Sequence, residues 1–395
     1  MKELAGGKRM LNSIFPITEN WSWLTFFLYL IVSLLTVSMC KRGIKYKESQ
    51  NHNEAVRGRK SIDSIICFIV AWALLVLLAT LRDDTVGTDM KNYIPYFLSK
   101  TSVDFDWKDF FSFQQREPAF QYYIYLLRSF TSNYTALYFY TYSLVAFSYI
   151  YYIFSTWTSS NSFIFLHIFI FYYYSNMSGM RSAMGSAFII LSFVALYHRS
   201  YLKAFVLTVI GILFHYTMIF NIFIIVAHWI LSERKLKEKK SLWIALIIST
   251  IAFANVGLYF LQAVISETKY DYYSVDSSET SLLGSMFFVV LGVFCIYYYK
   301  SIIHKDFITV TNMIICMAML AAYPLLFVTG AYRVPYYYVL PRLFIWSSIV
   351  DETKKRFPSR AYLLLDISIA CIVIMYLLLK FTKSSLDGGF IYHFK

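Results

Sequence analysis

Few places in this chain concentrate polar chemistry as tightly as the stretch from Arg82 to Asp89. Its eight residues hold one arginine and three carboxylates, with Gly87 and Thr88 leading into Asp89. A guanidinium stays charged and makes paired hydrogen bonds to phosphate oxygens, whereas a carboxylate can take a proton from an incoming hydroxyl. The stretch begins where the apolar run Ile62–Leu81 ends, so we expect it at a membrane surface. We interpret it as a loop that binds the charged part of a lipid-linked substrate.

Further arginines have positions that suit phosphate binding. Arg181 and Arg333 each lie in a short turn between two apolar segments, without a carboxylate nearby in sequence. An arginine at or within a membrane boundary often marks a substrate path. Several arginines converging on one face suit a diphosphate, because each can bond to its oxygens in a paired fashion. The candidate phosphate ligands are therefore Arg82, Arg116, Arg181 and Arg333.

The candidate groups for proton transfer are Asp89, Glu117 and His215. Either carboxylate is a candidate general base that takes a proton from an incoming hydroxyl, and the sequence does not choose between them. His215 lies within an apolar run, where it would bind the substrate or assist the transfer.

Each of these residues also has an ordinary structural interpretation. An arginine at a membrane boundary can reach for lipid headgroups. Asp89 can cap a helix that begins near Lys91. His215 can be a core residue whose ring is hydrogen-bonded by the neighbouring Tyr216 or Thr217. The sequence leaves these interpretations open beside the functional ones.

The composition indicates a polytopic membrane protein. Hydrophobic residues make up 58% of the 395 residues and charged residues 15%, against about 25% charged in a soluble domain. Apolar runs of about 20 residues recur, the length that crosses a bilayer as a helix. The net charge of +13 does not indicate nucleic acid, because the basic residues cluster in short loops, as membrane orientation requires. The five cysteines lack metal-ligand spacing and are interpreted as small buried hydrophobes.

The charges in the loops orient the chain in the membrane. The basic loop after the first run is expected in the cytoplasm, which places the loops 82–117 and 264–281 outside. Aromatic residues within 105–113 predict a short helix lying in the interface. We expect one transmembrane domain over 1–395, all-α, with about 10–12 membrane helices including short or re-entrant ones. The expected segments are Trp21–Cys40, Ile62–Leu81, Ala119–Phe130, Ala136–Phe154, Phe163–Tyr174, Asn176–Tyr197, Tyr201–Leu231, Leu242–Val264, Leu282–Tyr299, Phe307–Thr329, Val334–Val350 and Tyr362–Leu379.

The run Tyr201–Leu231 lies between two basic segments that both belong in the cytoplasm. One straight helix would leave the second of them outside, which contradicts the charge rule. At ~1.5 Å per residue the run can instead form two short inserted helices. We therefore predict a broken hairpin whose turn lies near His215 and points towards the outer face that holds the arginines.

Several familiar sites have no counterpart in the sequence. It contains no glycine-rich phosphate loop, no paired cysteine and histidine set for zinc, and no Asp-x-Asp on a soluble domain. A cytoplasmic nucleotide-sugar transferase and an ATP-driven pump are therefore disfavoured, and neither a metal nor a cofactor is expected.

At the residues singled out above, the sequence resembles the EpsG family of Wzy-like bacterial polysaccharide polymerases. The resemblance covers roughly residues 20–345. One departure is Ser182, since a glutamine often follows the family's arginine. The matching residues are Arg82, Gly87, Thr88, Asp89, Tyr93, Phe97, Glu117, Pro118, Phe120, Asn176, Met180, Arg181, Ala183, His215, Met218, Arg333 and Tyr337.

This resemblance implies a GT-C-like membrane fold and a glycosyltransferase of the hexosyltransferase type that extends O-antigen or exopolysaccharide chains. Undecaprenyl-diphosphate-linked oligosaccharides would be donor and acceptor, at the periplasmic face of the bacterial inner membrane. Membrane lipids, a chain-length regulator and a flippase would be its partners, and nucleic acid would not. The arginines, with Tyr93 and Tyr337, would bind the substrate, while Asp89 or Glu117 would activate the acceptor hydroxyl and His215 would assist.

Three other activities remain open on the sequence alone. An O-antigen ligase uses similar chemistry on a different acceptor. A flippase or transporter of the same lipid-linked units would place cationic residues on both sides of the bilayer. A membrane O-acyltransferase would use His215 as its catalytic histidine, but the stretch from Arg82 to Asp89 has no evident place in that chemistry.

Overall fold

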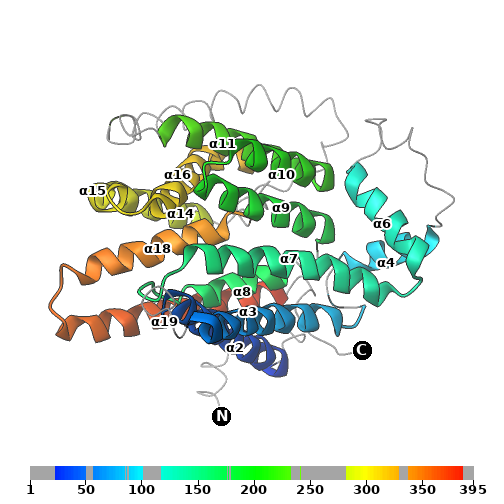
Figure 1. Ribbon diagram of the computed structural model, residues 1–395, viewed down its shortest axis with the longest axis horizontal. Coiled ribbons are helices and arrows are strands. Elements are labelled where there is room, and N and C mark those ends of the chain that lie inside the picture. Colours follow the sequence, from blue (N-terminus) through cyan, green and yellow to red (C-terminus); the bar gives the residue numbers. More distant parts are fainter. Residues whose placement is uncertain are drawn as a thin grey trace, which may run out of the picture.

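The structure is a computed structural model that describes residues 23–49, 57–84, 86, 89–100, 117–175, 177, 179–232, 241, 282–328 and 337–385. Every regular element within these ranges is a helix, which confirms the predicted all-α class. Most helices form one bundle, and α4 and α6 stand at its right-hand side in Figure 1. In chain order they are α2 (Trp23–Ser49), α3 (Arg57–Thr80), α4 (Met90–Ser99), α6 (Pro118–Phe130), α7 (Tyr134–Thr156), α8 (Leu166–Ser175), α9 (Met180–Tyr197), α10 (Tyr201–Phe214), the 3₁₀ turn η3 (Tyr216–Ile219), α11 (Phe220–Leu231), α14 (Leu282–Tyr297), α15 (Tyr299–Ile303), α16 (Phe307–Val328), α18 (Val339–Lys354) and α19 (Arg360–Ser385).

Four of the described helices are long and apolar enough to cross a membrane, in α2, α3, α9 and α19. Shorter apolar helices occur in α10, α11 and α16. The outward faces of α2 and α19 carry large apolar side chains, with Leu24 80% exposed and Leu363 67% exposed. Large exposed apolar faces mark interaction surfaces, including those that face a membrane. These features support a polytopic membrane protein, while the predicted total of about 10–12 membrane helices stays a prediction.

Helix boundaries differ from the expected ones where polar residues continue a helix. The first span was expected to end at Cys40, but α2 continues to Ser49 through a basic segment. Lysine and arginine are good helix formers, so the helix does not have to end where the membrane does. Helix α4 begins at Met90, which agrees with the structural interpretation of Asp89 as the residue before a helix that starts near Lys91. The predicted interfacial helix, and the loop 264–281, lie outside the described residues.

The interior of the bundle is formed by α7 and α9, which pack against each other. Helix α9 is mostly buried, whereas α19 at the periphery is mostly exposed. Local sequence explains where α7 begins, because the Asn133 side chain accepts a hydrogen bond from Thr135 N at 2.9 Å. This is an N-cap, which satisfies a backbone donor that the helix itself leaves open.

The predicted broken hairpin is confirmed for α10 and α11. Helix α10 ends at Phe214, His215 has an extended backbone, and η3 leads directly into α11. The start of α10 and the end of α11 lie side by side, as the 3.0 Å distance between the Tyr201 and Ser232 hydroxyls shows. Midway, the amide of Asn221 donates to Thr208 Oγ1 at 2.7 Å. The turn with His215 therefore lies at the far end of the hairpin from the basic loops.

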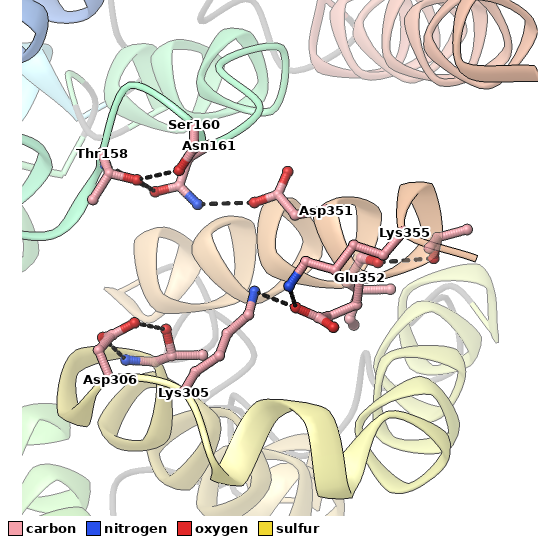
Figure 2. A network of polar contacts seen from close by, with 11 residues as sticks. Thr158, Ser160, Asn161, Lys305, Asp306, Asp351, Glu352 and Lys355 are labelled. Atoms are coloured by element: carbon pink, nitrogen blue, oxygen red, sulfur yellow. Dashed lines mark hydrogen bonds and ion pairs between the residues drawn. The ribbon is translucent and has the colours of Figure 1, made fainter. Parts of the chain in front are cut away.

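The opposite end of the bundle is held by a polar network. Figure 2 shows the Lys305 and Lys355 ammonium groups pointing at the Glu352 carboxylate, with N–O distances of 2.9 and 2.8 Å. In the same view the Asn161 side chain donates to Asp351 Oδ2 at 3.1 Å. These contacts tie the α7–α8 turn, the α15–α16 turn and α18 together at one end of the molecule.

Candidate functional site at Glu117

Glu117 occupies an unusual backbone position at the start of α6. Its φ of 59° and ψ of 62° are left-handed, a conformation that costs an ordinary residue about 1–2 kcal/mol. Pro118 follows at the first helical position and disfavours the right-handed helical conformation in the residue before it. Glu117 is also buried. Strained residues of this kind cluster at functional sites, which makes Glu117 the candidate centre of such a site.

Both carboxylate oxygens of Glu117 are engaged by side chains from other helices. Arg181, in the first turn of α9, donates from Nη1 to Oε2 at 2.5 Å. His215, at the end of α10, contacts Oε1 through Nδ1. When Nδ1 carries the proton, the second ring nitrogen, Nε2, is a proton acceptor. Glu117 therefore joins the ends of three helices and fixes the orientation of the imidazole.

Two tyrosines complete this group, which we call the Glu117 cluster: Glu117, Arg181, His215, Tyr93 and Tyr337. Arg181 Nε donates to the Tyr93 hydroxyl at 3.1 Å. Burial raises the pKa of Tyr93, and the nearby Arg181 opposes that shift. The phenol therefore keeps its proton, which can be donated to a ligand oxygen. The buried Tyr337 ring lies edge-on to His215, with centroids 6.4 Å apart.

The members of the Glu117 cluster differ in their access to solvent. The Glu117 side chain is 7% exposed and that of His215 is 23% exposed, whereas that of Arg181 is 43% exposed. Arg181 donates from Nη1 to Glu117 and from Nε to Tyr93. Its third nitrogen, Nη2, is directed to neither of these two residues. An anion arriving from outside would therefore meet the Arg181 guanidinium first.

The other candidates from the sequence have different positions. Asp89 is the N-cap residue of α4, but its side chain makes no capping hydrogen bond. Its carbonyl accepts from Tyr93 N at 3.1 Å, so it lies one turn from the cluster. Arg82 is fully buried and its side chain does not reach the surface. Arg116 and Arg333 lie outside the described residues.

Sequence reasoning named the members of the cluster singly but missed their arrangement. It treated Glu117 as a free base candidate, whereas both of its oxygens are taken by Arg181 and His215. It also missed the tyrosines around Arg82, although Tyr138 and Tyr142 stand one turn apart on α7. Among the described residues, no group of three or more histidines, cysteines and carboxylates is arranged to hold a metal ion.

A close helix crossing sets the distance between the two partners of Glu117. Gly185 on α9 faces Gly211 on α10, and a Cβ at either position would lie 3.1 Å from the carbonyl oxygen of the other. Small residues let two membrane helices approach in this way. Arg181 lies about one turn before Gly185, and His215 about one turn after Gly211. The crossing therefore brings the ends of α9 and α10 to the same carboxylate.

Replacing Gly211 with Ala should lower stability. Alanine gains about 1 kcal/mol of helix propensity over glycine, but overpacking costs typically 1–3 kcal/mol, and here the obstacle is a backbone carbonyl that cannot turn aside. We expect a net loss, seen as a lower unfolding midpoint of the purified protein in detergent. The matched control is Gly292→Ala, whose Cβ would meet the flexible end of Leu320. If both substitutions change the midpoint equally, the crossing is not the tight point described.

Comparison with known proteins identifies a family. The model of a family described as the EpsG family matches residues 65–393 of the chain. This range includes the whole Glu117 cluster and Arg82. No curated protein and no solved structure matches the chain.

Proposed function

The chain belongs to the EpsG family, and from this premise and the Glu117 cluster we propose that it is a metal-independent glycosyltransferase. Membership supports a polysaccharide-polymerase type of function acting on lipid-linked saccharides in a membrane. The finer proposal is that it joins oligosaccharide repeat units carried on undecaprenyl diphosphate. One observation supports it: the His215 imidazole and the Arg181 guanidinium are held on one carboxylate, and the guanidinium is the more exposed of the two.

In the proposed reaction an acceptor hydroxyl oxygen attacks the anomeric carbon of the donor sugar. His215 Nε2 takes the hydroxyl proton as general base. The bond between the anomeric carbon and the diphosphate oxygen breaks, and the diphosphate leaves with the electron pair. Direct displacement of this kind inverts the configuration at the anomeric carbon.

Glu117 serves in this scheme as a positioning residue rather than as the base. Both of its oxygens already accept hydrogen bonds from Arg181 and His215. His215 Nε2 is therefore a better acceptor for a substrate proton than either oxygen of Glu117. Its contact with Nδ1 holds the imidazole in the tautomer that leaves Nε2 able to accept a proton, as a carboxylate does in other histidine-dependent sites. Asp89 remains the alternative base, since it lies one turn from Tyr93 on the same element.

The leaving diphosphate would be bound by Arg181 and Tyr93. Arg181 offers Nη2 to a phosphate oxygen, and the Tyr93 hydroxyl offers its proton beside it. Donors placed where charge develops stabilise the transition state more than the ground state. Arg116 and Arg333 are proposed as further phosphate ligands, and Tyr337 as part of the wall behind His215.

The charge distribution supports a periplasmic site in the bacterial inner membrane. The α15–α16 turn carries Lys305 and the end of α18 carries Lys354 and Lys355, and Lys305 and Lys355 belong to the network in Figure 2. Lysine-rich loops stay in the cytoplasm. The His215 turn lies at the other end of the α10–α11 hairpin from the basic loops. We therefore propose that the Glu117 cluster lies on the outer side of the membrane.

The test is a polymerisation assay on the purified protein in nanodiscs, with undecaprenyl-diphosphate-linked repeat units and no nucleotide sugar. The wild type should give a ladder of chain lengths on a gel. His215→Asn should lose about 10²–10⁴-fold in rate, the usual contribution of a general base. Asparagine can place its amide near the Nδ1 position and keep the contact with Glu117, but it has nothing to replace Nε2.

Three results would contradict the proposal. Wild-type protein that gives no ladder with a verified cognate substrate would move the function to translocation or acyl transfer, and transfer to a different lipid acceptor would indicate a ligase. A His215→Asn variant with near-normal rate would show that the histidine only supports Glu117. His228→Asn provides a matched control, because His228 is a buried histidine that contacts Thr311 Oγ1 at 2.9 Å.

A further inference from the structure

Arg82 is the largest fully buried side chain among the described residues. Its guanidinium lies between two tyrosine rings of α7, 4.4 Å from the Tyr138 centroid and 4.8 Å from that of Tyr142. Such contacts favour a cation, all the more so when water is excluded. A buried charge is costly without compensating contacts, so these contacts must be reliably made whenever the protein is folded.

The first polar contact of Arg82 reaches the turn that carries Arg181. Arg82 Nη1 donates to the Met177 carbonyl at 2.8 Å, and Tyr142 donates to the same oxygen at 2.8 Å. Met177 lies four residues before Arg181 and is itself buried. Two donors thus hold the backbone immediately before α9. They thereby fix the backbone position of Arg181.

The second polar contact reaches the helix that carries Tyr93. Arg82 Nη2 lies 3.4 Å from the Met90 sulfur. Met90 is the first residue of α4 and is fully buried. Tyr93 follows three residues later, on the same face of the helix, and accepts the hydrogen bond from Arg181 Nε. One guanidinium therefore contacts the two segments whose side chains meet in the Glu117 cluster.

From these contacts we propose that Arg82 is a positioning residue. It holds the segments that carry Arg181 and Tyr93 where both side chains reach the Glu117 cluster, and it does not touch the substrate. This inference rests on the proposed function only for its effect on rate, since the positioning itself is a property of the free protein. Lysine cannot replace arginine here, because a single ammonium lacks the planar fork that reaches two partners from between two rings. The role differs from that expected for an arginine next to a membrane surface.

The test uses Arg82→Lys in the full chain, purified in detergent without substrate, and measures amide hydrogen exchange. We expect exchange in peptides covering residues 177–183 and 90–97 to become at least about tenfold faster, because the opening free energy of a local unit falls when its anchor is lost. Exchange in α11 and α16 should stay unchanged. This measurement needs no activity, so it stands even if the polymerase proposal fails.

Arg128→Lys is the matched control. Arg128 also lies over an aromatic ring, that of Phe97 at 5.8 Å, and also donates to a backbone carbonyl, that of Thr131 at 3.4 Å. It should leave exchange at 177–183 unchanged. In the polymerisation assay Arg82→Lys should lower kcat with little change in KM. Its effect should be much smaller when Arg181 is already replaced by Lys, because two residues that act as a unit are not additive.

Three outcomes would overturn the inference. Unchanged exchange at 177–183 in Arg82→Lys would show that Arg82 does not hold this turn, whatever the effect on rate. Equal acceleration throughout the chain would show general support of the fold rather than positioning. A rate loss that adds fully to that of Arg181→Lys would also contradict action through Arg181.

Discussion

Replacing Glu117 with Gln should reduce the polymerisation rate by about 10²–10⁴-fold, the range expected when a general base loses its function. Glutamine has the same shape but only one acceptor oxygen, whereas Glu117 receives two donors, from Arg181 and His215. If the amide group faces Arg181, two donors oppose each other. If it faces His215, Nδ1 has to become the acceptor, and Nε2 then carries the proton and cannot take another. The measurement is the initial rate of the ladder assay at saturating donor and acceptor.

Glu352→Gln is the matched control for this substitution. Glu352 is also a buried carboxylate held by two cationic side chains, Lys305 and Lys355 (Figure 2). It lies near the end of α18, on the opposite side of the bundle from α6 (Figure 1). Both variants lose a carboxylate charge between two partners, so both should lose some stability, and only Glu117→Gln should lose the rate with KM little changed. Similar rates for the two variants would remove Glu117 from the mechanism.

The sequence predicts features that depend on residue type or on the orientation of charged loops relative to the membrane. An arginine and a carboxylate near the ends of apolar runs, and a histidine within one, were enough to select Arg181, Glu117 and His215 as candidates. The charge of the loops on either side of residues 201–231 was enough to predict the hairpin, because a basic loop on the wrong side is disfavoured. Such inferences use local sequence and one global constraint, and the α10–α11 hairpin is confirmed in the structure.

The arrangement of the site depends on contacts between distant segments, which no local pattern reports. Arg82 follows an apolar run and was therefore expected at the surface. It is buried because residues far along the chain surround its guanidinium. The rings of Tyr138 and Tyr142 and the Met177 carbonyl contact it. In the same way, Glu117 was a free base candidate in the sequence and becomes the shared partner of two helices only when α9 and α10 cross at Gly185 and Gly211.

Replacing Arg181 with Lys should lower kcat/KM for the lipid-linked donor by about 10²–10³-fold, the loss typical when one donor to a developing negative charge is removed. Arg181 contacts Glu117 and Tyr93 with two nitrogens, and the third, Nη2, is the proposed donor to phosphate. A lysine ammonium is one point of charge and cannot reach all three in a fixed geometry. Because the diphosphate gains charge as the bond breaks, kcat should fall nearly as much as kcat/KM. Both constants are measured by varying the donor at saturating acceptor.

The control for Arg181→Lys is Arg356→Lys at the opposite end of the bundle, where the guanidinium lies over the Tyr298 ring at 4.6 Å and donates to the Tyr297 hydroxyl at 3.0 Å. Both substitutions keep the charge and remove the fork, but only Arg181 adjoins the proposed diphosphate. A rise in KM with unchanged kcat would mean that Arg181 binds the ground state and transition state equally. Its role would then be capture of the anionic lipid, and stabilisation of the leaving group would have to come from Tyr93 or from the proposed ligands Arg116 and Arg333.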